Sequence, residues 1–259
     1  LKGIIRKNSR IVAAHDLLAQ VFEKRGDSQK VQQVLEEAVR ISPKAILRQK
    51  ALGKISYRNK DLTTAEQSFK EVVRQGKNSV LKNAADYTSL AKVLIDKDVP
   101  EQSLGVLEEA EKEFADSIEA AVQISVAEGF AFKKMNRENE ALKAIQKASD
   151  LSTKLTQALP AEAALDLARA FYITGEDERA TSVIKQLVQN NQNNPEVIDT
   201  VYNLLVRPAN LPAVAQFHEW MTGAGLLYLK KRAPEIGTVF TTHATVLGRA
   251  LAGAGVDIY

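Results

Sequence analysis

The segment LLAQVFEKRGDSQKVQQVLEEAVRISP, residues 17–43, aligns without gaps on ALGKISYRNKDLTTAEQSFKEVVRQGK, residues 51–77, when it is shifted by 34 residues. Equivalent positions carry similar residues in the two copies: Leu18 and Leu52, Ala19 and Gly53, Leu35 and Phe69. A repeat of this length is typical of a unit made of two helices joined by a turn. We therefore expect helical hairpins that stack one on the next.

The same pattern continues down the chain with small insertions. A small residue recurs in the first helix of each later unit, and a larger residue recurs in the second helix: Ala91 and Leu107, Gly129 and Ile145, Ala168 and Ile184. The small residue lets the second helix approach the first, and the larger residue fills the space between neighbouring repeats. Turn residues stand where the helices of each hairpin should meet, at 25–27, 59–61, 96–100, 135–138 and 174–177. No single unit can bury its apolar face, whereas stacked units can.

In period and in this alternation of small and large residues, residues 11–206 resemble the tetratricopeptide-repeat family. The resemblance implies an all-α solenoid of about five repeats, although the family's tryptophan is missing and Glu128 stands where Leu is usual. The strings AHDLLAQVFEKRGD, 14–27, and VLEEAVRISPKAILRQKALGKISYRNKDL, 34–62, are also similar to the C-terminal repeat region of bacterial response regulators. That similarity implies the output region of a signalling protein.

Composition narrows the classes of function. The 259 residues carry a net charge of +3, which is too small to indicate nucleic-acid binding, and they include no cysteine. We expect no metal, no cofactor and no catalytic residues in the repeats. The absence of cysteine favours a reducing compartment, so we expect a cytoplasmic protein. The sequence contains no apolar run long enough to span a membrane, so we expect no membrane partner. The chain begins at Leu1 rather than methionine, from which we expect a piece of a longer protein.

Solenoids of this kind are usually binding surfaces, with a groove lined by the first helix of each hairpin. The predicted groove positions are mostly cations: Lys50, Lys54, Arg58, Lys92, Lys133, Lys134 and Arg169. Such a stripe would suit a protein or peptide partner with acidic residues or a C-terminal carboxylate. The alternative is a solvated face whose lysines keep the solenoid soluble. The first repeat places Asp16 and Glu23 at equivalent positions, which favours the alternative.

After Pro208 the pattern changes. Short apolar runs at 213–217 and 237–242 predict strands, and the segments 222–232 and 244–255 predict helices. An alternation of strand and helix is typical of a parallel α/β sheet, in which ligands bind at the carboxyl ends of strands. Polar residues that follow the two predicted strands would gather there: His218, Glu219, Thr242 and His243.

The strings HEW, 218–220, and TTHATVLGR, 241–249, look like those of eukaryotic-type glycogen synthases. The resemblance covers about 213–259 and implies a fragment of a Rossmann-like domain, in which His218 would lie by the sugar-nucleotide site. About 47 residues cannot complete a two-domain transferase, so we expect this site to be vestigial. An unusual cap on the solenoid is the alternative for the tail.

We therefore expect a solenoid at 1–207, a junction at 208–212, and a partial Rossmann-like fragment at 213–259. A natural fusion, an engineered fusion and an error in the source sequence each agree with this division. The function expected is a protein-interaction scaffold. The alternative is a glycosyltransferase fragment with the helices as an accessory module.

Overall fold

The computed structural model describes residues 3, 8, 10–191, 197, 201, 214–218 and 237–241. The chain divides into two compact units, Leu1–Asn190 and Asn191–Tyr259. Ten helices are described in the first unit: α2 (Val12–Lys24), α3 (Ser28–Ile41), α4 (Ile46–Arg58), α5 (Leu62–Gly76), α6 (Ala84–Asp96), α7 (Pro100–Glu113), α8 (Ile118–Lys134), α9 (Glu138–Ser152), α10 (Ala161–Ile173) and α11 (Asp177–Asn190).

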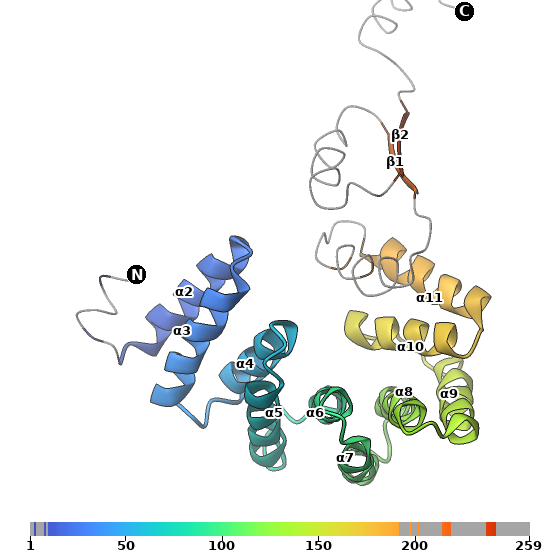
Figure 1. Ribbon diagram of the computed structural model, residues 1–259, viewed down its shortest axis with the longest axis horizontal. Helices are drawn as coiled ribbons and strands as arrows, with labels where there is room; N and C mark the ends of the chain where they lie inside the picture. Colours follow the sequence, from blue (N-terminus) through green and yellow to red (C-terminus); the bar gives the residue numbers. More distant parts are fainter. Residues whose placement is uncertain are drawn as a thin grey trace, which may run out of the picture. The chain divides into compact units, whose positions relative to one another are not determined.

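The helices of the first unit pair as hairpins in chain order: α2 with α3, α4 with α5, α6 with α7, α8 with α9, and α10 with α11. Figure 1 shows these hairpins following one another along an arc, with α6 and α8 on its inner side and α5, α7 and α9 on its outer side. Helices α6 and α8 also pack directly on each other. The predicted all-α solenoid of stacked hairpins is confirmed.

The turn inside each hairpin contains a residue with left-handed backbone: Gly26, Lys60, Asp98, Asn136 and Gly175, with φ between 58° and 77°. The amide that follows this residue donates back to the carbonyl five residues earlier, as Asp27 does to Phe22 and Asp61 does to Ser56. These bonds satisfy the carbonyls left over at a helix end. In the first two hairpins, the aspartate of this turn also caps the next helix. Its carboxylate accepts from the amide of Lys30 or of Thr64.

Small and large residues meet inside the hairpins. A Cβ atom added at Gly53 would lie 2.9 Å from the ring of Phe69, and one added at Gly129 would lie 2.6 Å from Ile145. The small residue therefore allows the close approach that the sequence pattern predicts. The predicted large residues Leu35, Phe69, Leu107 and Ile145 are buried, whereas Ile184 is only half-buried. Ile184 lies on α11, after which no further hairpin is described.

The core runs from hairpin to hairpin. Its middle part joins α5 to α8 through apolar side chains that include Phe69, Tyr87, Leu94, Leu107 and Ile124. Further clusters lie between the first two hairpins and between α8 and α11. His15 on α2 is also buried, at 1% exposed. Because each cluster spans neighbouring hairpins, burial depends on stacking.

In the second unit, β1 (Val214–His218) and β2 (Gly237–Thr241) form a parallel pair in which Val214 lies opposite Gly237 and His218 lies opposite Thr241. Both strands lie where the sequence predicts them. The helices predicted at 222–232 and 244–255 lie outside the described residues. Among the residues that the structure describes, no helix combines the length and the apolar character needed to cross a bilayer.

Candidate functional site

The seven cations predicted to line a groove lie on the first helices of four hairpins. Three of them stand on α4, one each on α6 and α10, and two on α8: Lys50, Lys54 and Arg58, then Lys92 and Arg169, then Lys133 and Lys134. Each α4 position follows the previous one after four residues, so the three side chains share one side of that helix. The structure gives most of these cations partners within the chain itself.

Lys50 is held between α4 and α6. Its Nζ atom lies 2.8 Å from Oδ2 of Asp86 and donates to the carbonyl oxygen of Leu81 at 3.2 Å. The side chains of Lys50 and Asp86 are 21% and 10% exposed. Burial raises the pKa of the Asp86 carboxyl above its usual range, and the neighbouring ammonium of Lys50 opposes this shift. Lys50 therefore contributes to packing between helices.

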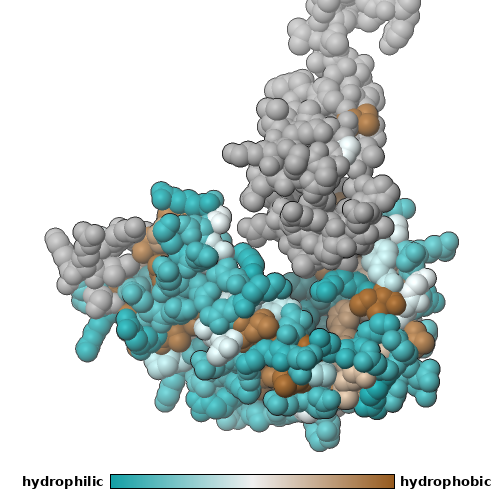
Figure 2. All heavy atoms as spheres, viewed as in Figure 1, coloured by the Kyte–Doolittle hydropathy of each residue, from teal (hydrophilic) through white to brown (hydrophobic). Residues whose placement is uncertain are grey.

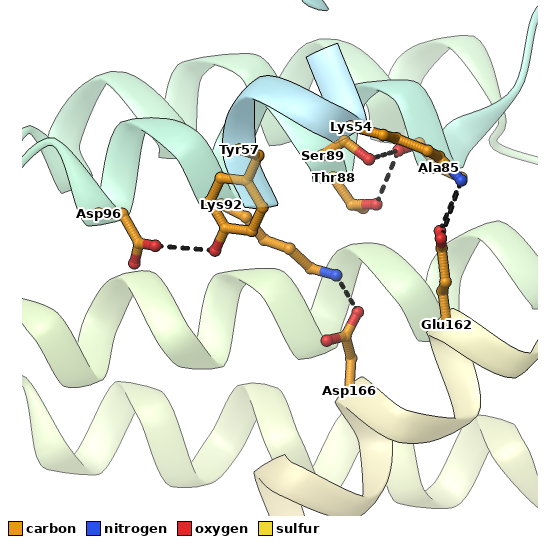
Figure 3. A network of polar contacts seen from close by, with 9 residues as sticks. All are labelled: Lys54, Tyr57, Ala85, Thr88, Ser89, Lys92, Asp96, Glu162 and Asp166. Atoms are coloured by element: carbon orange, nitrogen blue, oxygen red, sulfur yellow. Dashed lines mark hydrogen bonds and ion pairs between the residues drawn. The ribbon is translucent and has the colours of Figure 1, made fainter. Parts of the chain in front are cut away.

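Two further lysines meet carboxylates of α10. Lys54 Nζ donates to Oε1 of Glu162 at 2.8 Å and to Oε2 at 3.1 Å, across 108 residues of sequence. Lys92 Nζ donates to Asp166, one turn further along α10. Figure 3 shows both pairs beside the hydrogen bond from Tyr57 Oη to Asp96 Oδ2, which is 2.8 Å long. Helix α10 thus supplies the acids that neutralise part of the predicted stripe.

The other four cations differ from one another. Lys133 Nζ lies 2.7 Å from Oε2 of Glu138 at the start of α9, and Lys134 Nζ lies 2.9 Å from Oδ1 of Asp98. The guanidinium of Arg169 lies 5.6 Å from the centre of the Phe130 ring. Arg58 is exposed, and within the described part of the chain it makes no ion pair. The role of these cations in binding a partner stays a prediction.

A hollow of about 780 Å³ lies between the first two hairpins, and we call it the α2–α4 hollow. Its lining includes the apolar side chains of both hairpins: Ala19, Val31, Leu35, Ala51 and Ile55. Leu47 and Leu81 also line it, and they are 64% and 42% exposed. Figure 2 shows the viewed face of the molecule as largely hydrophilic with separate hydrophobic patches. Exposed leucines beside a hollow are the feature that sequence reasoning missed.

The α2–α4 hollow has more cations than carboxylates in its lining. Arg48 bridges to Asp16 through two hydrogen bonds of 2.9 and 2.8 Å, which raise the pKa of the guanidinium. Asp16 and Glu23 are the two carboxylates of the lining, and its four cations are Lys44, Arg48, Lys54 and Arg58. Once Arg48 and Asp16 are paired, the lining keeps a positive excess. The hollow therefore combines apolar surface with positive charge.

A small cavity of about 50 Å³ is lined by residues of α6, α8 and α10, among them Lys92 and Asp166, and has room for about one or two water molecules. No group of three or more histidine, aspartate or glutamate side chains placed to hold a metal ion occurs among the described residues.

Of the four tail residues predicted to gather by a strand end, only His218 falls within the described part, as the last residue of β1. Glu219, Thr242 and His243 lie outside the described residues. The parallel pairing puts the carboxyl ends of β1 and β2 at one edge, as the prediction requires. The gathering of the four side chains stays a prediction.

The helical part is similar in structure to a thermophilic TPR protein of Thermus thermophilus, with a TM-score of 0.50 and 14% identity over 75% of this chain and 99% of that one. The solenoid has the tetratricopeptide-repeat fold. At an identity this low, the structural similarity shows the fold of the solenoid and nothing about its ligand.

The end of the chain is similar to a different family. The family model for glycogen synthase matches residues 197–259. A glycogen [starch] synthase of Dictyostelium discoideum is 56% identical over 46 residues, which are 18% of this chain and 5% of that protein. The human liver enzyme is also 56% identical over 46 residues, or 6% of its length. The chain thus spans about one-twentieth of the synthases it matches.

Proposed function

We propose that this protein is an interaction scaffold whose α2–α4 hollow binds an apolar, acidic segment of a partner protein. The hollow itself carries the proposal, because it joins a volume of about 780 Å³ to exposed leucines and a positive lining. A volume of this size is within the range of ligand pockets, ~300–1,000 Å³, and accommodates a few side chains. The occupant would therefore be a short segment of a partner.

The apolar part of the lining would receive apolar side chains of the partner, which would anchor it in the hollow. Leu47 and Leu81 are 64% and 42% exposed, and covering them would remove apolar surface from solvent. Such burial contributes roughly 25 cal/mol per Å². A partner with leucine-like side chains at helical or extended spacing would fill the hollow between α2 and α4.

The cations of the lining would pair with acidic residues that flank those anchors in the partner's sequence. Lys44 and Arg58 are exposed at the hollow, and Lys54 of α4 also lines it. Carboxylates on the partner would meet these cations, which favours fast and selective association. The acidic partner expected from the sequence is therefore assigned to this hollow rather than to the whole stripe, much of which is paired within the chain.

For the tail, we infer that it has no glycosyltransferase activity in this chain. The inference rests on the small share of the synthases that the match covers. An assay of glucose transfer from a sugar nucleotide tests it, with His218→Ala as the comparison. Transfer by the unaltered chain that is lost in His218→Ala would overturn the inference.

A finer role, as the output region of a response regulator, is supported only by the resemblance of residues 14–62. The reading frame that encodes this chain tests it. A phosphoacceptor receiver domain encoded upstream would support the role, and a different upstream domain would count against it.

Fluorescence polarisation with a labelled synthetic peptide that repeats Glu-Leu-Leu-Glu tests the binding proposal. We expect saturable binding that weakens in salt, because the peptide's carboxylates are screened. Lys44→Glu with Arg58→Glu should weaken binding strongly. Lys112→Glu, an exposed reversal on α7, serves as the matched control. Absence of binding, or equal affinity for both variants, would contradict the proposal.

A further inference from the structure

Lys54 belongs to two features at once. Its side chain lines the α2–α4 hollow, and its Nζ atom donates to both carboxylate oxygens of Glu162 on α10. Among the described residues, none from α10 lines the hollow. A carboxylate of a partner bound in the hollow and Glu162 of α10 could therefore both pair with the ammonium of Lys54.

Two acidic residues of α10 form ion pairs with lysines that were predicted to bind an acidic partner. Glu162 and Asp166 are one helical turn apart, and they meet Lys54 on α4 and Lys92 on α6. Figure 3 shows both carboxylates reaching from α10 toward the lysines of the other two helices. The chain thus places two carboxylates of its own on the lysines predicted for an acidic partner.

The two ion pairs differ in exposure. Lys54 and Glu162 are 54% and 64% exposed, whereas Lys92 and Asp166 are 26% and 15% exposed. Exposed pairs are screened by water and contribute little to stability. The Lys54–Glu162 bridge is therefore the one that a competing carboxylate can displace, whereas the Lys92–Asp166 pair is better shielded from solvent.

We propose that Glu162 is an internal competitor for Lys54, so that an acidic segment binding in the α2–α4 hollow displaces Glu162 and opens the bridge between α4 and α10. This inference rests on the proposed function. The two events are linked reciprocally, because whatever weakens the bridge strengthens binding by the same factor, and binding weakens the bridge. When bound, the partner would place a carboxylate on Lys54 in place of the carboxylate of Glu162.

A cycle of substitutions measures the linkage with the Glu-Leu-Leu-Glu peptide. Glu162→Gln should tighten binding about two- to fivefold, the effect of releasing one exposed ion pair. Lys54→Gln should weaken binding, and Glu162→Gln should then have no further effect. Glu138→Gln removes the similarly exposed partner of Lys133 and should leave the affinity unchanged. Equal affinities for the wild type and Glu162→Gln would overturn the inference.

Zero-length crosslinking with a carbodiimide gives a second measure on the unaltered chain. Lys54 and Glu162 are close enough to form an amide, as are Lys133 and Glu138, and mass spectrometry quantifies both products. Added peptide should lower the yield of the Lys54–Glu162 product relative to the Lys133–Glu138 product. A constant ratio while the peptide binds, or no Lys54–Glu162 product at all, would overturn the inference and spare the proposed function. A peptide that never binds would overturn both.

Discussion

Gly53 lies directly against the ring of Phe69: a Cβ atom built on Gly53 would come within 2.9 to 3.0 Å of three ring carbons. The two residues stand on the two helices of one hairpin, α4 and α5. Phe69 also packs with side chains of the next hairpin, including Tyr87 and Leu90. The glycine therefore sets how near the helices approach, and the ring then fills the joint between hairpins.

Gly53→Ala should destabilise the solenoid by about 1–3 kcal/mol, as an extra methyl does in a filled core. The matched control is Gly105→Ala on α7, where a new Cβ atom meets nothing within 4 Å. There the better helix propensity of alanine should stabilise the fold by ~0.5–1 kcal/mol. Urea melts of both variants test the pair. The same sign of change in the two would contradict the packing described.

Phe69→Ala should cost roughly 3–5 kcal/mol, because the side chain is 3% exposed and its removal leaves a cavity between hairpins. Leu142→Ala on α9 provides the control, since Leu142 is 49% exposed and should change stability by less than about 0.5 kcal/mol. Thermal unfolding followed by circular dichroism measures both. A loss below about 1 kcal/mol for Phe69→Ala would show that the repeat register is wrong.

Glu128→Gln should stabilise the protein at neutral pH by ~0.5–2 kcal/mol. Glu128 is half-buried on α8, where burial, followed by repulsion from Glu111, raises the pKa of its carboxyl above 4.5. A raised pKa means that the wild type loses stability as the pH climbs from below 4.5 through the folded-state pKa.

The advantage of Glu128→Gln should therefore be present at pH 7 and vanish below about pH 4, where the wild-type carboxyl is protonated in both states. Melts across this range check it. Glu108→Gln, at an exposed carboxyl whose pKa is lowered by Lys112, should lack this trend. An advantage of Glu128→Gln that persists unchanged in acid would refute the account of this carboxyl.

The backbone amides of β1 and β2 should exchange with deuterium much faster than those in the middle of α6 and α8. The described part of the second unit holds a sheet of two strands, and sheets this small are marginally stable in water. Hydrogen exchange read by mass spectrometry gives the comparison. Protection of residues 214–218 and 237–241 equal to that of α6 would show that the tail forms a stable structure.

The repeat architecture could be predicted because it depends on local patterns. The period of 34 residues, the small residue at Gly53 or Gly129, and the turn residues Gly26 and Gly175 are all visible in the sequence. The left-handed backbone at Lys60 and Asp98 was harder to predict, because lysine and aspartate adopt this conformation less readily than glycine does. There the hairpin geometry decided the conformation.

The partners of the groove cations could not be predicted. Sequence placed Lys54 and Lys92 on inner helix faces, but Glu162 and Asp166 reach them only through the curvature accumulated over several hairpins. The α2–α4 hollow was equally hidden, because it depends on the distance between two first helices rather than on any motif. The exposed Leu47 was its one visible signal, in a position where a solvated helix face would carry a polar residue.

The central claim is that the α2–α4 hollow binds a partner segment, and Leu47→Asp tests it most directly. The substitution removes an exposed apolar anchor and adds a charge that repels an acidic segment, without opening the core. Leu142→Asp, at another exposed leucine away from the hollow, is the control. Polarisation titrations with the Glu-Leu-Leu-Glu peptide should show affinity falling about tenfold or more for Leu47→Asp, since burying a leucine contributes ~1.5–3 kcal/mol and 1.4 kcal/mol is a factor of ten. Leu142→Asp should bind like the wild type. Equal affinity for all three proteins would contradict the claim.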